Sequence, residues 1–167
     1  MERKAHFGRY RGLSTGPLTL YNLLERTHLQ PRKAVERMPD SEATTRNIHV
    51  TVEAAYDPSR SNPHAQQWLF LYTVKITNEG TETVQLISRH WVITDAMGKV
   101  EEVRGPGVVG EQPILGPGQS FRYTSGCPLT TPFGSMHGEY QMVAQGGVQF
   151  DVEIAPFTLT EPYTTVN

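Results

Sequence analysis

Apolar and polar side chains alternate along most of the chain after residue 47. Every second residue is apolar from Ile48 to Tyr56, and the same holds from Trp68 to Ile76. A period of two is typical of a β-strand with one buried face, because successive side chains of a strand point to opposite sides. The pattern therefore predicts strands rather than helices for this part of the chain.

Five further segments carry apolar residues in a strand-like pattern, and glycine, proline or asparagine marks the turns between them. The predicted strands are residues 48–56, 68–78, 84–95, 100–103, 120–125, 136–144 and 148–154. No helical pattern separates them, so we expect an all-β fold, a seven-stranded antiparallel β-sandwich. A single cysteine cannot form the disulfide of an antibody domain, which favours the fibronectin-III variant of the Ig-like sandwich.

The first 46 residues lack this alternation, and only part of them, after an irregular stretch at 9–17, carries a helical pattern. Pro17 suits the first position of a helix, and Leu20, Leu23 and Leu24 then share one helical face until Pro31 ends the stretch. A helix of this length is not stable alone, so it must pack on its own domain or on a partner. The expected divisions are a short helical N-terminal extension at 1–46, a sandwich domain at 47–162 and a tail at 163–167.

The composition indicates an intracellular protein. Apolar residues make up 37% of the 167 residues and nowhere form a run long enough to span a membrane. The N-terminus lacks the apolar stretch of a secretory signal, and a lone Cys127 suits a reducing compartment. We expect a cytoplasmic protein. The arginine-rich start is also compatible with the mitochondrial matrix, although acidic residues such as Glu2 are atypical of an import sequence.

Charge is divided unevenly between the extension and the sandwich. Residues 1–46 carry nine basic and five acidic side chains, a net +4, which leaves six basic and twelve acidic side chains, a net −6, in the rest. A basic arm on an acidic body can bind RNA phosphates or an acidic protein, or fold back onto its own domain. A solvated leader without a partner is the alternative. The candidate arm contacts are Arg3, Lys4, Arg9 and Arg11.

Arg89, His90 and Trp91 form the most distinctive polar cluster of the sequence. On a strand, Arg89 and Trp91 face one side and His90 faces the other. In one interpretation Trp91 lies in the core and hydrogen bonds satisfy His90. In the other, Arg89 and His90 belong to an exposed recognition patch, because arginine and aromatic residues are enriched at protein interfaces.

Gly105, Gly107 and Gly110 have the spacing of a dinucleotide-binding glycine loop. That loop requires a helix directly after it, because the N-terminal amides of the helix hold the pyrophosphate. Residues 111–118 contain two prolines and two glycines, which leave no room for a helix. A conformational role in tight turns is therefore favoured over phosphate binding. The counter-charges available to a phosphate would be Arg104 and Arg122.

No residue pattern indicates catalysis or a metal site. The six histidines never fall two or four positions apart, as paired metal ligands on one face of a strand or helix do. Residues 134–138 read Gly-Ser-Met-His-Gly, in which the serine is not at the centre of a nucleophile elbow. Cys127 and His137 are a conceivable thiol pair, but nothing around them marks a nucleophile. We therefore expect no enzyme, no cofactor and no metal.

Several short motifs occur together in the sandwich region. They are RHWVITD at 89–95, EVRGPGVVG at 102–110, FRYTSG at 121–126, GSMHGEY at 134–140 and IAPFTL at 154–159. Together they resemble the ApaG domain family over about residues 44–162. The basic leader of about 45 residues departs from the short bacterial form of that family.

The resemblance implies a fibronectin-III-like sandwich that acts as a protein-binding unit. The family occurs as free-standing bacterial proteins and as the C-terminal module of some eukaryotic F-box proteins and of a polymerase-δ-interacting protein. A pyrophosphate site has been suggested for the family because of its glycines. The extra leader makes membership of a larger assembly more plausible for this chain.

Three functions follow from these observations. We expect first a non-enzymatic binding module whose surface near residues 89–110 docks a protein partner. The second is an accessory or structural subunit of a large assembly, such as an organellar ribonucleoprotein, anchored by the basic N-terminal arm. The third is a phosphate- or nucleotide-binding protein that uses residues 105–110. The partner-binding candidates are Arg89, His90, Arg104 and Arg122.

Overall fold

The alternating segments form strands in the computed structural model, which describes residues 39–162. Two single turns of 3-10 helix, Pro58–Arg60 and Pro63–Ala65, lie between the second and third strands. The strands are β1 (Ser41–Thr45), β2 (Ile48–Tyr56), β3 (Trp68–Asn78), β4 (Val84–Asp95), β5 (Val100–Pro106), β6 (Ile114–Leu115), β7 (Ser120–Leu129), β8 (Phe133–Ala144) and β9 (Gln149–Thr160).

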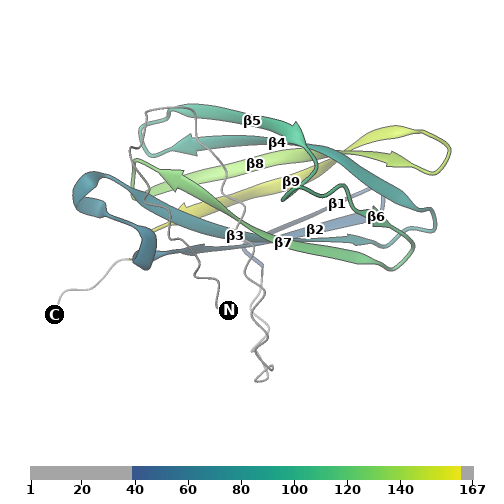
Figure 1. Ribbon diagram of the computed structural model, residues 1–167, viewed down its shortest axis with the longest axis horizontal. Helices are drawn as coiled ribbons and strands as arrows, with labels where there is room; N and C mark the ends of the chain where they lie inside the picture. The colour runs from purple at the N-terminus through teal and green to yellow at the C-terminus, as the bar shows by residue number, and fades with distance from the viewer. Residues whose placement is uncertain (1–38, 163–167) are drawn as a thin grey trace, which may run out of the picture.

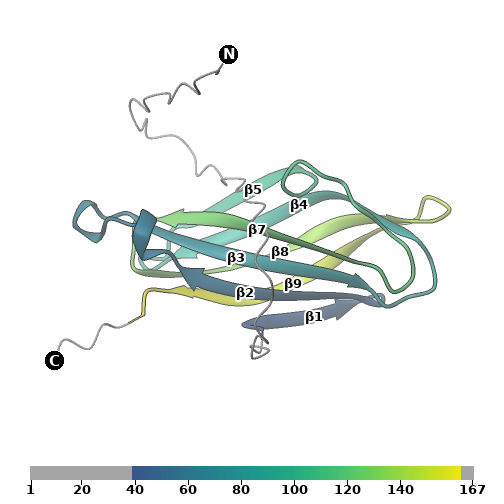
Figure 2. The same cartoon turned by 60° about the horizontal axis from the view of Figure 1, so that its bottom comes forward.

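The strands form two antiparallel sheets that stack as a sandwich (Figures 1 and 2). One sheet has the order β1-β2-β3-β7, and the other has the order β5-β4-β8-β9, with the short β6 paired to β4. The Ser41 hydroxyl donates to the Ala155 carbonyl at 3.0 Å, and the Glu153 amide donates to the Thr45 hydroxyl at 3.1 Å. These bonds join β1 to β9 and close one side of the sandwich. β5 and β7 are consequently the outer strands on the opposite side.

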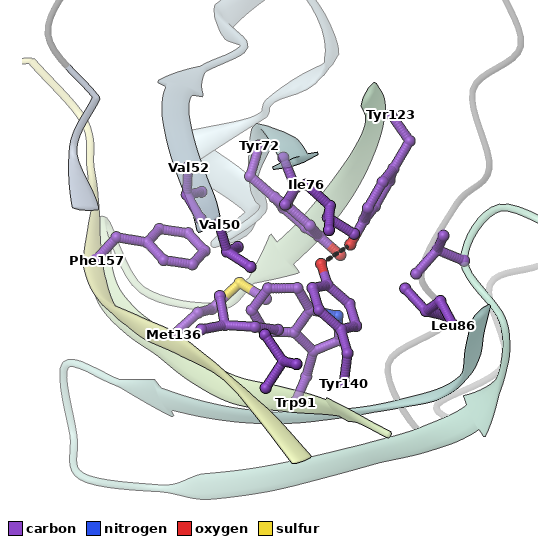
Figure 3. Close-up of a cluster of buried hydrophobic side chains, with 14 of the residues drawn as sticks. Val50, Val52, Tyr72, Ile76, Leu86, Trp91, Tyr123, Met136, Tyr140 and Phe157 are labelled. Atoms are coloured by element: carbon purple, nitrogen blue, oxygen red, sulfur yellow. Dashed lines mark hydrogen bonds between the residues drawn. The ribbon is translucent and has the colours of Figure 1, made fainter. Parts of the chain in front are cut away.

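Aromatic side chains from both sheets fill the space between them (Figure 3). Trp91 on β4 is fully buried, and its ring lies 5.3 Å from the ring of Tyr72 on β3 and 6.0 Å from that of Phe157 on β9. Both contacts are close to edge-to-face, the arrangement that aromatic rings prefer. Trp91 therefore ties the two sheets together at the centre of the core.

The core also contains three buried tyrosine hydroxyls. The hydroxyls of Tyr123 and Tyr140 are 2.5 Å apart (Figure 3), and Tyr72 is hydrogen-bonded to Ser125. Burial raises the pKa of all three phenols above its usual value, so the hydroxyls stay protonated. A buried hydroxyl needs a hydrogen-bond partner, because otherwise its lost hydration is not compensated. The Tyr123–Tyr140 pair meets this requirement with one bond.

The structure confirms an all-β antiparallel sandwich of two sheets but corrects the strand count. Nine strands are described rather than seven, and the two additional strands are β1 and β6. β1 falls in the part assigned to the extension, and it was missed because its residues are mostly polar and its position depends on pairing with β2 and β9. β6 has only two residues, too few to show a period.

Some expectations about the ends of the chain stay predictions. The helical stretch expected between residues 17 and 31, and the tail at 163–167, lie outside the described residues. Residues 41–45, which were assigned to the extension, form a strand that pairs with β2 and so belong to the sandwich. Within residues 39–162, no helix is long and apolar enough to cross a membrane.

Replacing Tyr140 by Phe tests the buried hydroxyl pair. We expect Tyr140→Phe to lower the free energy of unfolding by about 1–3 kcal/mol, because the Tyr123 hydroxyl loses its partner. Tyr56→Phe is the matched control, since Tyr56 is only half-buried and its change should stay within about 0.5 kcal/mol. Urea unfolding followed by fluorescence measures both. Equal changes in the two variants would contradict the role given to the pair.

Candidate functional site

The β4–β5 hairpin brings together most of the residues that the sequence singled out. Arg89 pairs with Gly105 across the two strands, and His90 pairs with Arg104. Because side chains alternate along β4, Arg89 shares the inner side with the buried Trp91, while His90 lies on the outer face. The hairpin thus separates the two polar residues of the cluster onto opposite faces of one sheet.

Arg89 holds the beginning of the glycine loop. Its Nη1 donates to the Pro106 carbonyl at 3.1 Å and to the Gly107 carbonyl at 2.8 Å. Gly105 lies against the guanidinium, and a Cβ placed there would be 3.3 Å from Nη1. These contacts make Arg89 a support for the loop rather than a residue of the same exposed surface as His90.

His90 lies between two carboxylates on the outer face of the sheet. Its Nε2 is 2.9 Å from Glu102 on β5, and its Nδ1 is 3.2 Å from Glu139 on β8. Arg104 adds a contact to the same Glu102 carboxylate, at 3.2 Å. The hydrogen bond from His90, and then the one from Arg104, hold the pKa of Glu102 below its usual value. This network fastens three neighbouring strands to one another across the sheet surface.

Arg122 belongs to a different surface. It lies on β7, in the other sheet, where it sits opposite Lys75 and forms a long ion pair of 3.6 Å with Glu53. The four partner-binding candidates therefore do not form one patch. The arm candidates Arg3, Lys4, Arg9 and Arg11 lie outside the described residues.

The glycine loop uses its own amides internally. The Gly107 amide donates to the Ile87 carbonyl at 2.8 Å, and Val108 and Glu111 bond each other through both of their amides at 2.8 and 2.9 Å. Gly107 has a φ of +57° and Gly110 one of +80°, and the next element is β6, not a helix. A phosphate cradle needs several amides free to donate. The geometry accordingly favours the conformational role of these glycines and lends no support to a phosphate site.

The open edge of β5 was not recognised from the sequence. The bonds from the Asp95 amide to the Lys99 carbonyl and from the Gly107 amide to the Ile87 carbonyl fix the pairing with β4. In this register, the odd-numbered residues of β5 direct their backbone groups toward β4. The even-numbered ones direct theirs outward, where the described part of the chain places no other strand. The outward-facing residues are Val100, Glu102, Arg104 and Pro106.

The sequence feature that could have identified this edge is the composition of β5 itself, with charged residues and a proline at alternate positions. Its exposed and half-exposed residues alternate throughout, and it continues to Pro106 rather than ending at Val103 as expected. A proline at an outward position is typical of an edge strand, since proline has no amide hydrogen to donate.

The two partners of His90, Glu102 and Glu139, were also missed. They lie on β5 and β8, and the sequence alone does not show that these strands are the neighbours of β4.

The polar residues described above form ion pairs and hydrogen bonds with one another, and neither a metal-ligand group nor a reactive thiol accompanies them in residues 39–162. Among residues 39–162 no group of three histidine, cysteine or acidic side chains is placed to hold a metal ion. Burial raises the pKa of Cys127 to about 12, so its thiol stays protonated and is a poor nucleophile at neutral pH.

Two alanine substitutions separate the roles of the loop glycines. A Cβ at position 107 would lie 2.2 Å from the Glu111 carbonyl oxygen, whereas a Cβ at position 110 meets open space. Both positions have positive φ, which costs about 1–2 kcal/mol for a residue other than glycine. We expect Gly107→Ala to destabilise the protein by at least about 1 kcal/mol more than Gly110→Ala in denaturant unfolding. Equal losses would show that the close approach is not a constraint.

Removing the imidazole tests the network around His90. In His90→Ala we expect the pKa of Glu102 to rise toward its usual value, because its principal hydrogen bond is lost. Carboxyl carbon shifts followed by NMR across a pH titration measure this pKa. The control is His49→Ala, which removes a histidine of the other sheet that contacts Glu42 and Glu79, and it should leave the pKa of Glu102 unchanged. An unaltered Glu102 titration in His90→Ala would contradict the network.

Comparison with known proteins gives a consistent result. A family model of the ApaG domain matches residues 58–144. Protein ApaG of Rhodopseudomonas palustris (strain TIE-1) is 56% identical over 120 residues, which are 72% of this chain and 92% of that protein. Protein ApaG of Bordetella pertussis (strain Tohama I) is 53% identical over 118 residues, 71% of this chain and 90% of that protein.

Solved structures agree with the sequence comparison. The crystal structure of the putative ApaA protein from Bordetella pertussis matches with a TM-score of 0.68 at 54% identity, over 70% of this chain and 95% of that one. A structural genomics X-ray structure matches with a TM-score of 0.67 at 44% identity, over 72% of this chain and 92% of that one. On the family model and these identities together, the chain belongs to the ApaG domain family.

Proposed function

We propose that the chain is a non-enzymatic binding module that docks an extended segment of a partner protein along β5. The observation that carries the proposal is the outer edge of β5, whose outward-facing backbone groups have no partner strand within residues 39–162. An added strand that pairs with such an edge gains main-chain hydrogen bonds, and neighbouring side chains supply specificity.

The surroundings of the edge suit a protein ligand. Val100 and Met97, at the start of the strand and in the turn before it, are 55% and 84% exposed and offer apolar contact. Glu102 and Arg104 place opposite charges next to each other along the outer face. Exposed apolar side chains beside charges that fix the register are features of protein interfaces.

The proposal also accounts for the arrangement of polar groups behind the edge. His90 on β4 contacts Glu102 on β5 through one ring nitrogen and Glu139 on β8 through the other. A network of this kind stiffens the sheet next to its edge, and a rigid edge loses less entropy when a strand is added. Arg89 serves the same purpose from the inner side by holding the turn that follows β5.

Proline substitution at position 104 tests the docking edge. The Arg104 amide points outward, so Arg104→Pro breaks no bond to β4, as Pro106 already illustrates two residues later. We expect Arg104→Pro to weaken partner binding by about tenfold or more, because a partner strand loses one hydrogen bond and meets the proline ring. Arg104→Ala, which removes the charge but keeps the amide, is the matched control.

The measurement is affinity purification of the full chain and both variants, with mass spectrometry of the captured proteins. Partners retained by Arg104→Ala and lost by Arg104→Pro support docking through the edge. Circular dichroism and thermal unfolding establish that both variants are folded. Capture of the same proteins at equal yield by Arg104→Pro and Arg104→Ala would overturn the proposal.

A further inference from the structure

We infer that β5 pairs with β5 of a second copy of this chain, giving a two-fold symmetric dimer with one sheet running through both copies. The inference rests on the proposed function, because it uses the same edge, and it names the partner strand. A two-fold interface must be self-complementary. If one residue of the first copy faces a second residue of the other copy, symmetry makes the second residue of the first copy face the first residue of the other. The edge of β5 satisfies this condition.

Only some registers are available to two antiparallel copies of β5. The outward backbone groups belong to even-numbered residues, so an even-numbered residue must face an even-numbered residue of the second copy. Three registers place the charged part of the strand at the axis. Glu102 then faces Glu102, Glu102 faces Arg104, or Arg104 faces Arg104 of the second copy.

The middle register is the one that charge selects. Like charges directly opposite each other destabilise a strand pair, which disfavours the first and third registers. In the middle register symmetry produces two Glu102–Arg104 pairs, one on each side of the axis. Both side chains are more than half exposed, at 54% and 64%, and are already aligned on one face by their own 3.2 Å contact. The dimer would convert one ion pair per strand into a cluster of four alternating charges.

The ends of the strand limit the pairing in the same register. Val100 would face Pro106 of the second copy, where the Val100 amide donates to the proline carbonyl. Pro106 has no amide hydrogen and its ring faces the second copy, so the pairing ends at this residue without leaving a donor unpaired. The network behind the edge also contributes, because His90 holds the Glu102 carboxylate in place at 2.9 Å before the second copy arrives.

The other open edge does not have this property. β7 carries a single charged residue, Arg122, and its cross-strand neighbour on β3 is Lys75. When β7 pairs with itself, no register places an acidic residue of one strand opposite Arg122 of the other. β5 is therefore the self-complementary edge of the two.

Charge reversal tests the inference on the full chain of 18.7 kDa. We expect the wild type to sediment as a dimer of twice this mass at micromolar concentration. Arg104→Glu and Glu102→Arg should each raise the dimer Kd by at least about tenfold, since each places like charges at the axis. The double variant Glu102→Arg/Arg104→Glu should return the Kd to within about threefold of wild type, because opposite charges face each other again.

The outcomes separate this inference from the proposed function. A wild type that stays at 18.7 kDa up to millimolar concentration overturns self-pairing, as does a dimer that Arg104→Glu leaves unchanged or that the double variant fails to restore. If self-pairing fails while Arg104→Pro still loses a protein that Arg104→Ala retains, the edge binds a different chain and the proposed function stands. Thermal unfolding of each variant excludes loss of fold as the cause of a changed mass.

Discussion

The packing of Trp91 against aromatic rings of other strands is the interaction on which the rest of this structure depends. The indole comes from the middle of β4, and the rings that meet it come from β3 in one sheet and β9 in the other. Strands of a sandwich are apolar on one face only, so neither sheet is stable without the other. The central contact fixes which face of β4 is inside, and thereby places His90 outside and Arg89 inside.

The hydroxyls in the core add a directional requirement to this packing. Dispersion and burial hold the sheets together without specifying a unique alignment. The short contact between the Tyr123 and Tyr140 hydroxyls requires β7 and β8, which belong to different sheets, to stand in one relative position. A satisfied polar pair in an apolar core therefore restricts how the sheets can slide.

The candidate site follows from how the sandwich closes. One side is sealed by hydrogen bonds between β1 and β9, and as a result β5 and β7 remain as outer strands on the other side. Outer strands of natural sheets carry charges and prolines that prevent indiscriminate pairing. On β5 these are Glu102, Arg104 and Pro106, and their order both protects the edge and restricts the strands that can pair with it.

The sequence by itself determined the fold class and most of the strands. The period of two from Ile48 to Tyr56 and from Trp68 to Ile76 reports burial on one face, which is a local property of each strand and can be read from spacing alone. The glycine spacing was also informative, because the prolines after Gly110 already excluded the helix that a pyrophosphate needs. The family pattern in the motifs rests on the same local information.

Only the tertiary structure decided which residues share a site. His90 acquires Glu139 as a partner because β4 and β8 are neighbours in the sheet, although the two residues are 49 positions apart in the chain. Arg122 was placed with Arg89 and Arg104 among the partner-binding candidates, and the strand order separates it onto the other sheet. The open edge of β5 is likewise a consequence of strand order. Strand order is set by the simultaneous packing of all strands around one core, and no local pattern of residues encodes it.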